Sequence, residues 1–157
     1  MIEACRSGDA DAVEKLLRSS HTPWGDANKF DSQGRSALMW ACKHSDERCA
    51  RLLLEAGADP DHAEMMGGNA LMVCASEGRF ECVRLLCLHG ATLTSRSRSG
   101  YTAMDYARLF GYGHIATWLA KQQQSSAAEK AAAATKLQAR RRGQLDRQRA
   151  NTLAIIS

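Results

Sequence analysis

Apolar, glycine and short polar residues return along this chain at a spacing of 33 residues. When the sequence is shifted by 33, the unit at 31–63 falls on two later stretches of similar character. Similarity at this period, concentrated at apolar and glycine positions, predicts a stack of repeated units rather than one closed core. The aligned sets are Gly34, Gly67 and Gly100; Cys49, Cys82 and Ile115; and Leu53, Leu86 and Leu119.

Each unit is expected to contain two helices. The first opens behind a short polar residue that can accept a hydrogen bond from the amides of the first turn. The second carries apolar residues on one helical stripe and ends at a glycine, which favours a left-handed backbone. The polar caps are Ser36, Asn69 and Thr102; the stripes are Cys49, Leu52 and Leu53, then Cys82, Leu85 and Leu86, then Ile115, Trp118 and Leu119; the glycines are Gly57 and Gly90.

These units resemble the ankyrin repeat. The resemblance implies an all-α fold, an ankyrin-repeat solenoid of helix-turn-helix repeats with β-turn fingers, and function by binding rather than by chemistry. Two positions depart from the family pattern. Alanine, an excellent helix former, stands where proline is favoured, and the usual histidine of the first helix is absent. These positions are Ala37, Ala70 and Ala103, then Met39, Met72 and Asp105.

The repeats are expected to occupy residues 2–121. The cap at their start matches only the second half of the unit, as expected for an end unit with one face in water. An insertion of four residues around Trp24 follows it, and we expect Trp24 to cover the apolar edge of the cap. Ser126 to Glu129 is read as a capping box that opens an alanine-rich helix. The boundaries are: cap 2–30; repeats 31–63, 64–96 and 97–121; linker and start of the alanine-rich helix 122–134; basic C-terminal helix 135–150; and the last residues of the tail, 151–157.

Composition is ordinary for a globular protein, with 45% apolar and 24% charged residues. The start of the chain carries an early acid and no basic-then-apolar run, and no apolar stretch approaches membrane-spanning length. We therefore expect no secretory signal and no transmembrane segment, and a cytoplasmic monomer, with the cytoskeleton as one candidate location. The six cysteines have no metal-ligand spacing, so we interpret them as small buried hydrophobes.

Charge is divided unevenly along the chain. From residue 122 onward there are seven basic and two acidic residues, a net charge of +5, whereas the whole chain carries +4. The remainder, 14 basic and 15 acidic residues, is therefore −1. An anionic partner is accordingly expected in this C-terminal segment, residues 122–157, which we call the tail.

The tail resembles a complete IQ motif, the short helical element that captures calmodulin or related EF-hand light chains. The apolar member offers a ridge that a methionine-lined groove can grip, and the arginines face the acidic lobes of an EF-hand protein. The glycine weakens the free helix, so part of it is expected to order on binding. The residues that match the motif are Leu137, Gln138, Arg142, Gly143 and Arg147.

Two other interpretations of the tail stay open. It is either a solvated basic helix without a specific partner, or a segment that binds nucleic acid or an anionic membrane by charge alone. Nucleic acid is favoured less because the tail has no aromatic residue for base stacking and no recognition fold accompanies it.

A second candidate binding surface is the concave face of the stack. The resemblance implies that finger residues and outward positions of the first helices bind a protein there. Two adjacent methionines and two aromatic residues are expected to form an exposed apolar patch. Carried across position by position, this face comprises Gln33, Arg35, Lys43, His44, Met65, Met66, Ser76, Glu77, Arg98, Ser99, Tyr101, Leu109 and Phe110.

The sequence gives no support for a catalytic, cofactor-binding or metal-binding site. A glycine-rich run at 111–116 lies between two predicted helices rather than after a strand, and the acids at 59–64 lack the other ligands of a calcium loop. No nucleophile has a base at recognisable spacing, so we expect no catalytic, cofactor or metal site. Ser97 and Ser99 lie between arginines and are candidate phosphate acceptors, although a plain solvated fingertip is the simpler interpretation. The sequence thus predicts a non-enzymatic adaptor.

Overall fold

The computed structural model describes residues 1–19, 27–44, 46–129, 131–132 and 134–135. The chain divides into two compact units, Met1–Leu119 and Ala120–Ser157. Trp24, which was expected to cover the cap, lies outside the described residues.

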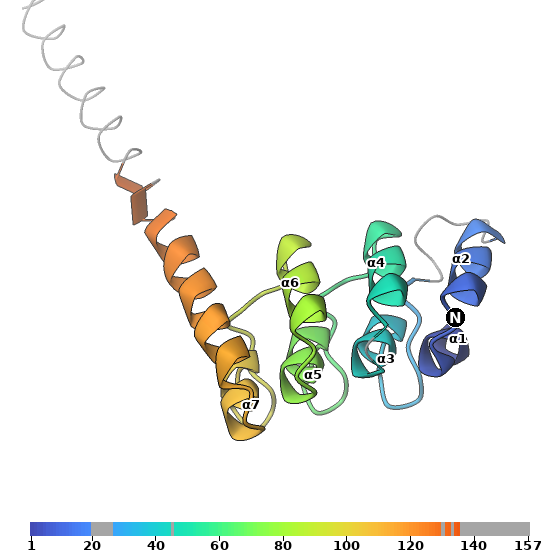
Figure 1. Ribbon diagram of the computed structural model, residues 1–157, viewed down its shortest axis with the longest axis horizontal. Coiled ribbons are helices and arrows are strands. Elements are labelled where there is room, and N and C mark those ends of the chain that lie inside the picture. Colours follow the sequence, from blue (N-terminus) through green and yellow to red (C-terminus); the bar gives the residue numbers. More distant parts are fainter. Residues whose placement is uncertain (20–26, 45, 130, 133, 136–157) are drawn as a thin grey trace, which may run out of the picture. The chain divides into compact units, whose positions relative to one another are not determined.

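The first unit is a row of contacting helix pairs. Each pair packs on the next through both of its members, which produces two layers: α1, α3, α5 and α7 in one, and α2, α4 and α6 in the other (Figure 1). Residues 113–119 are helical and take the second position of the last pair. The described part of the chain contains no strand, which agrees with the predicted all-α class. The bounds are α1 (Ile2–Ser7), α2 (Ala10–Ser19), α3 (Ala37–Lys43), α4 (Glu47–Glu55), α5 (Ala70–Ser76), α6 (Phe80–Leu88) and α7 (Ala103–Leu109).

Three of the first-layer helices, α3, α5 and α7, begin where the sequence predicts. In each of α3, α5 and α7 the side-chain oxygen of the preceding polar residue accepts a hydrogen bond from an otherwise unpaired backbone N–H of the first turn. At α7 the cap is reciprocal, because the Asp105 carboxylate also accepts the Thr102 backbone N–H at 2.9 Å. The donor–acceptor distances are 3.2 Å from Met39 N to Ser36 Oγ, 3.0 Å from Met72 N to Asn69 Oδ1 and 3.3 Å from Asp105 N to Thr102 Oγ1.

Glycine ends two of the second-layer helices, α4 and α6, as predicted. Gly57 and Gly90 both have φ of 82°, in the left-handed region. The residue after each glycine then donates its N–H back into the helix, Ala58 to the Leu53 carbonyl oxygen at 2.9 Å. The equivalent bond at the other helix, from Ala91 N to Leu86 O, is 3.0 Å. These bonds satisfy carbonyl groups that would otherwise lack a partner.

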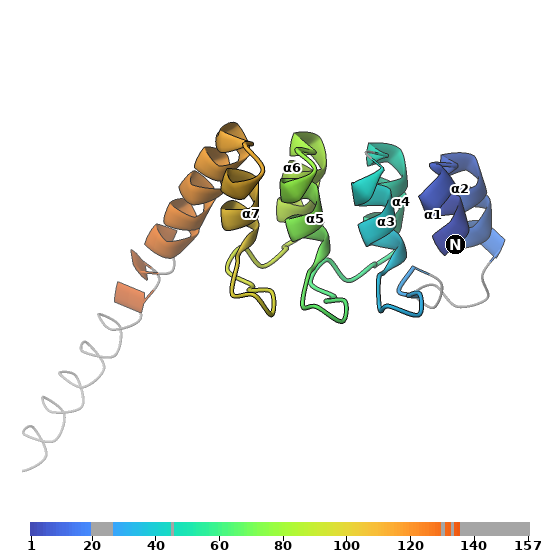
Figure 2. The same cartoon turned by 90° about the horizontal axis from the view of Figure 1, so that it is seen from below.

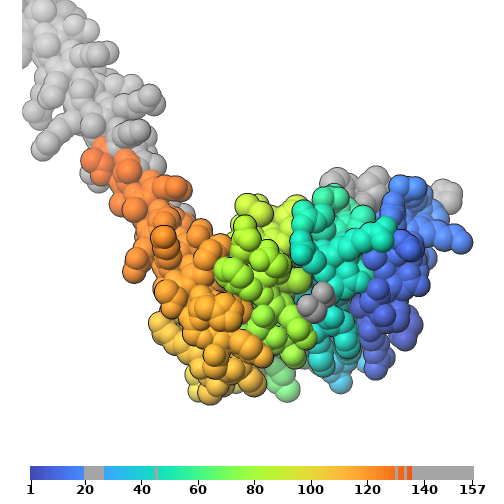
Figure 3. All heavy atoms as spheres, in the orientation of Figure 1, coloured from blue at the N-terminus to red at the C-terminus, as the bar shows by residue number. Residues whose placement is uncertain are grey.

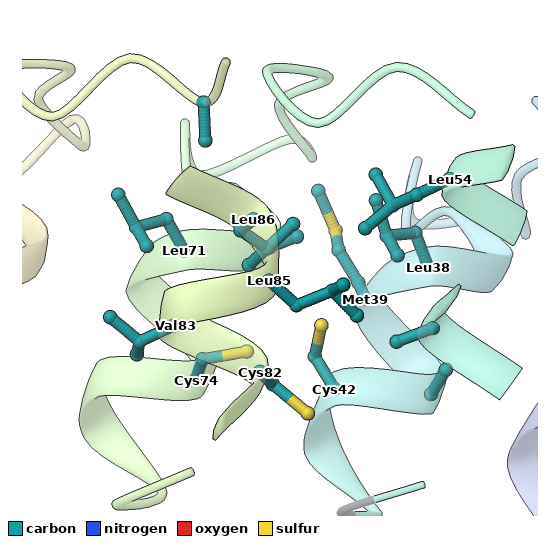
Figure 4. Packing of buried hydrophobic residues seen from close by; sticks show 14 of the residues in the cluster. Leu38, Met39, Cys42, Leu54, Leu71, Cys74, Cys82, Val83, Leu85 and Leu86 are labelled. Carbon is teal, nitrogen blue, oxygen red and sulfur yellow. The ribbon is translucent and has the colours of Figure 1, made fainter. Parts of the chain in front are cut away.

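A continuous core runs between the layers and from repeat to repeat. Neighbouring repeats lie in direct contact along the row (Figure 3), and Met39 and Cys42 of α3 face Leu85 and Cys82 of α6 (Figure 4). Most of the predicted stripe residues are buried. The other two, Leu52 and Trp118, are partly buried and pack against this core.

Fingers project from one side of the first unit (Figure 2). Each closes on itself through two backbone hydrogen bonds, as in the first, where Asp31 N donates to Arg35 O at 3.0 Å and Gly34 N to Asp31 O at 2.9 Å. Neighbouring fingers are also joined, by Met65 N to Gln33 O at 3.2 Å and by a similar bond of 2.9 Å between the second and third fingers. The fingers therefore form a connected row.

In the second unit, residues 120–129, 131–132 and 134–135 are helical. Ser126 lies inside this helical run and does not begin a helix, so the predicted capping box is wrong. The glutamines before it are good helix formers, and Ser125 Oγ donates to the Lys121 carbonyl oxygen at 3.2 Å, a bond typical of serine within a helix. Of the basic helix predicted at 135–150, all but Thr135 lies outside the described residues. No helix among the described residues is long and apolar enough to cross a membrane.

Candidate protein-interaction surface

The residues predicted for the concave face lie on the fingers and at the ends of the first-layer helices. We call this region, together with the exposed ends of α1, the inner surface. Three of the predicted residues are half-buried: Arg35, Ser76 and Glu77. The others are exposed: Gln33, Lys43, His44, Met65, Met66, Arg98, Ser99, Tyr101, Leu109 and Phe110.

The second and third repeats expose large apolar side chains on this surface. Leu109 and Phe110 end α7 at positions where the earlier repeats carry Lys43 and His44, then Ser76 and Glu77. Such side chains gain free energy when they leave water, so these exposed positions favour a protein partner over solvent. We call the set the apolar cluster; Met65, Met66 and Tyr101 lie on the fingers, and Leu109 and Phe110 lie at the C-terminal end of α7. Its members and their exposed fractions are Met65 59%, Met66 67%, Tyr101 47%, Leu109 66% and Phe110 55%.

At the other end of the inner surface, Trp40 organises a polar network. Its indole Nε1 donates to Asp31 Oδ2 at 3.2 Å, and Arg35 Nε donates to the same oxygen at 3.0 Å. The Arg35 guanidinium lies 4.4 Å from the centre of the indole ring. Partial burial acts to raise the pKa of Asp31. The hydrogen bonds from the Arg35 and Gln33 backbones and from the Arg35 and Trp40 side chains outweigh it and hold that pKa below the ordinary value.

Two further cations face the same indole. The Arg6 guanidinium lies 5.0 Å and the Lys43 ammonium 5.4 Å from the ring centre, and His44 stacks near it at 5.9 Å between ring centroids. Trp40 is only 7% exposed as a result. We call Trp40 with Arg6, Arg35 and Lys43 the Trp40 cluster.

A shallow depression of about 240 Å³ lies between α3 and α5 beside this cluster. Its volume is below the roughly 300–1,000 Å³ of small-molecule pockets, so it suits a side chain of a partner better than a ligand. Four of its lining residues were predicted from the sequence. The lining comprises Arg35, Met39, Trp40, Lys43, Glu64, Val73, Ser76 and Glu77.

Sequence reasoning missed Arg6 and Trp40. Arg6 could have been found, because it aligns with Lys43 once the four-residue insertion is allowed for. Trp40 had no comparable signal, since its equivalents in the later repeats are Val73 and Tyr106. Only the stacked structure shows that cations from three segments meet on its ring.

The tail residues predicted to bind calmodulin are not tested by this geometry. Leu137, Gln138, Arg142, Gly143 and Arg147 all lie outside the described residues.

The two candidate phosphate acceptors differ in accessibility. Ser97 is 7% exposed, and its hydroxyl oxygen accepts a hydrogen bond from the Tyr106 hydroxyl at 3.2 Å. Ser99 is exposed. Of the pair, only Ser99 presents its hydroxyl to a modifying enzyme.

The cysteines are free thiols, and five of the six are buried. Burial raises the pKa of Cys5 to about 11 and that of Cys74 well above its ordinary value. Because the thiolate is the reactive form, Cys5 and Cys74 behave as packed apolar groups. The described residues include no group of three or more acidic, histidine or cysteine side chains placed to hold a metal ion.

Comparison with known proteins adds the family. A family model described as three copies of the ankyrin repeat matches residues 1–64 and 58–130. The chain is 32% identical over 124 residues to a glycerophosphocholine phosphodiesterase of Schizosaccharomyces pombe. The aligned region covers 78% of this chain and 11% of that protein. It is 34% identical over 102 residues to the ankyrin repeat domain-containing protein SAT10 of Stachybotrys chartarum, and this aligned region covers 65% of this chain and 5% of that protein.

A mouse homologue of B-cell lymphoma 3 protein is 30% identical over 105 residues, 66% of this chain and 23% of that protein. The chain thus spans less than a quarter of each of these three relatives. The family model nevertheless covers the cap, the three repeats and the finger turns described above. The chain belongs to the ankyrin repeat family.

Proposed function

We propose that this chain is a non-enzymatic adaptor that binds a protein through its inner surface and calmodulin or an EF-hand light chain through its tail. The observation that carries the first half is the apolar cluster, because it places exposed Leu109 and Phe110 where the preceding repeats carry charged and polar residues. Ankyrin repeats are protein-interaction modules, so a protein partner is the expected occupant.

The tail half of the proposal is supported by residue spacing. Leu137 and Gln138, then Arg142 and Gly143, then Arg147 stand in the register of an IQ motif. In this proposal Leu137 anchors in the apolar groove of the partner, Gln138 bonds to its backbone, and the two arginines pair with its carboxylates. A cytoplasmic location, with the cytoskeleton as one candidate site, belongs to the same proposal.

The non-enzymatic part of the proposal is supported by the kind of surface that the stack presents. The match to the phosphodiesterase covers 11% of that protein. An activity carried by the rest of that protein gives no ground for proposing the same activity here.

A second function for the tail is favoured by charge alone. The tail carries +5 against −1 for the remainder of the chain. A segment of this kind can bind nucleic acid or an anionic membrane electrostatically, and such binding falls steeply as salt rises.

A calmodulin pull-down of the full chain, once with calcium and once with a chelator, tests the proposal. The wild-type chain is expected to be retained in at least one condition, and a Leu137→Asp, Arg142→Ala variant to be lost. The matched control makes the same two changes on the stack, Leu88→Asp and Arg84→Ala, at side chains that are exposed. This control is expected to bind as the wild type does.

Two outcomes would contradict the tail assignment. One is no retention of the wild type in either condition. The other is equal retention of the wild type and the tail variant. Binding to RNA or to phosphatidylserine vesicles that disappears as salt is raised, without calmodulin binding, would favour the electrostatic function.

A further inference from the structure

The inner surface is chemically different at its two ends. The Trp40 cluster lies at the cap and first repeat, and the apolar cluster lies at the second and third. Equivalent positions connect them: Arg6 aligns with Lys43, Ser76 and Leu109 in successive repeats. A partner that lies across the row of first-layer helices, from α1 to α7, would meet cations first and apolar side chains last.

The cations of the Trp40 cluster are incompletely neutralised. Asp31 pairs with Arg35, whereas among the described residues Arg6 pairs only with Glu3, at 4.0 Å, and both of those side chains are largely exposed. Within the described part of the chain, Lys43 has no carboxylate at ion-pair distance. Three like charges around one ring repel each other, and a carboxylate from a partner would relieve that repulsion.

The finger carboxylates Asp31 and Glu64 neutralise this cluster only through the Asp31–Arg35 pair, because their oxygens also hold the fingers in shape. Asp31 accepts the backbone N–H groups of Gln33 and Arg35 at 2.9 and 3.0 Å. Glu64 accepts those of Met66 and Gly68 at 2.8 and 3.0 Å. Asp31 Oδ2 holds Arg35 and Trp40 in place, whereas Arg6 and Lys43 remain available to a carboxylate from a partner.

The distance between the two clusters sets the length of the partner segment. Lys43 and Leu109 are two repeats apart, and packed helices are spaced by roughly 8–10 Å. The separation is therefore about 20 Å. It corresponds to about six residues of extended chain at roughly 3.3 Å each, or about 13 residues of helix at 1.5 Å each.

We propose that the inner surface recognises a peptide segment of a partner protein that has acidic residues at one end, bound by the Trp40 cluster, and apolar residues at the other, bound by the apolar cluster. Glu77 ends α5, the helix of the intervening repeat, and its charge disfavours further acids in the middle of the segment. This inference rests on the proposed protein-binding function of the inner surface and adds the chemistry and spacing of the partner.

The test is a selection of random 16-residue peptides displayed on phage against the immobilised full chain. Enriched peptides are expected to carry two or more Asp or Glu residues, followed or preceded by an apolar pair about six or about 13 positions away. A labelled synthetic peptide from the selection is then titrated with the full chain by fluorescence anisotropy.

Three variants locate the binding. Arg6→Glu with Lys43→Glu is expected to weaken the selected peptide at least about tenfold, because two attractive exposed pairs become repulsive. Leu109→Ser with Phe110→Ser is expected to weaken it to a similar degree. The matched control Arg51→Glu with Arg84→Glu places the same charge change on exposed arginines of α4 and α6, and is expected to stay within about twofold of the wild type. Circular dichroism melts verify that each variant is folded.

Enriched peptides without an acidic end, or equal losses in the charge variant and its control, would overturn this inference and leave the protein-binding function standing. Peptides whose affinity is unchanged in both inner-surface variants bind elsewhere, for instance at the basic tail, and also overturn it. A selection that enriches no peptide counts against protein binding by the inner surface itself.

Discussion

Gly67 lies in the turn of the second finger with φ of 76°, against the backbone of the third finger. A Cβ built on it would stand 3.0 Å from Arg98 N and 3.4 Å from the Ser97 backbone. Gly100 occupies the equivalent turn of the last finger with φ of 81°, and a Cβ there would meet nothing within 4 Å. The two glycines share a conformation and differ in their surroundings.

Replacing each glycine with alanine separates backbone strain from crowding. Placing alanine in the left-handed region costs roughly 1–2 kcal/mol. Gly100→Ala should cost only this strain. Gly67→Ala should cost about 1–3 kcal/mol more, because Arg98 N is backbone and cannot move without disturbing its hydrogen bond to Met66 O.

Urea unfolding followed by circular dichroism measures both variants against the wild type, with the midpoint shift at unchanged slope giving the difference in the free energy of unfolding. Gly34→Ala provides a second reference for backbone strain alone, since its Cβ would meet Glu64 and Met65 backbone atoms at 3.5 Å, an ordinary contact distance. The expected order of destabilisation is Gly67 first, with Gly34 and Gly100 similar. Equal losses for Gly67→Ala and Gly100→Ala would refute the claim that finger-to-finger packing adds to the strain.

Other changes probe the core, one cap and the thiols. Leu86→Asp places a charge at a fully buried position, so the stack should melt in one transition at a much lower temperature. Leu88→Asp, at an 82% exposed position, should leave the melting temperature nearly unchanged. Similar melting temperatures for the two variants would contradict the assigned core. Hydrogen bonds from Thr102 lower the pKa of Asp105 below its ordinary value of 3.8, so its contribution to stability is present above that value and is lost as pH falls through the lower, folded-state pKa. Asp105→Asn should therefore flatten the acid end of a stability-versus-pH curve, and an unchanged curve would count against this cap. Native chain treated with a thiol reagent should react first at Cys87, which is only partly buried, and at the other five cysteines only on unfolding; six equal rates in the native state would be inconsistent with the core.

The features predicted correctly from sequence are those whose partners lie close along the chain. Ser36 caps α3 by a bond to a residue three positions later, and Gly57 ends α4 through its own backbone conformation. The burial of Leu53 and Leu86 follows from helical spacing within one unit together with the repeat period. Period, caps and stripes are local signals, so the helix pairs and their order could be read directly.

The features that were missed depend on contacts between segments. Cations from α1, the first finger and α3 lie over the Trp40 ring, and only the packing of these segments against each other brings them together. Ser97 is enclosed because the Tyr106 hydroxyl reaches back to it from α7. Ser126 was misread because the motif fits locally, although the preceding residues are already helical. Neither long-range packing nor helix continuation is encoded in the spacing of one motif.

The central claim is that one chain joins a protein-binding stack to a tail that holds an EF-hand protein, and isothermal titration of the full chain with calmodulin tests it most directly. One calmodulin per chain is predicted, in calcium, in chelator or in both. The stoichiometry and affinity are predicted to survive Leu109→Ser with Phe110→Ser on the inner surface, and binding to disappear in Leu137→Asp with Arg142→Ala. Absence of binding in both conditions, or binding that depends on the inner surface and not on the tail, would contradict the account.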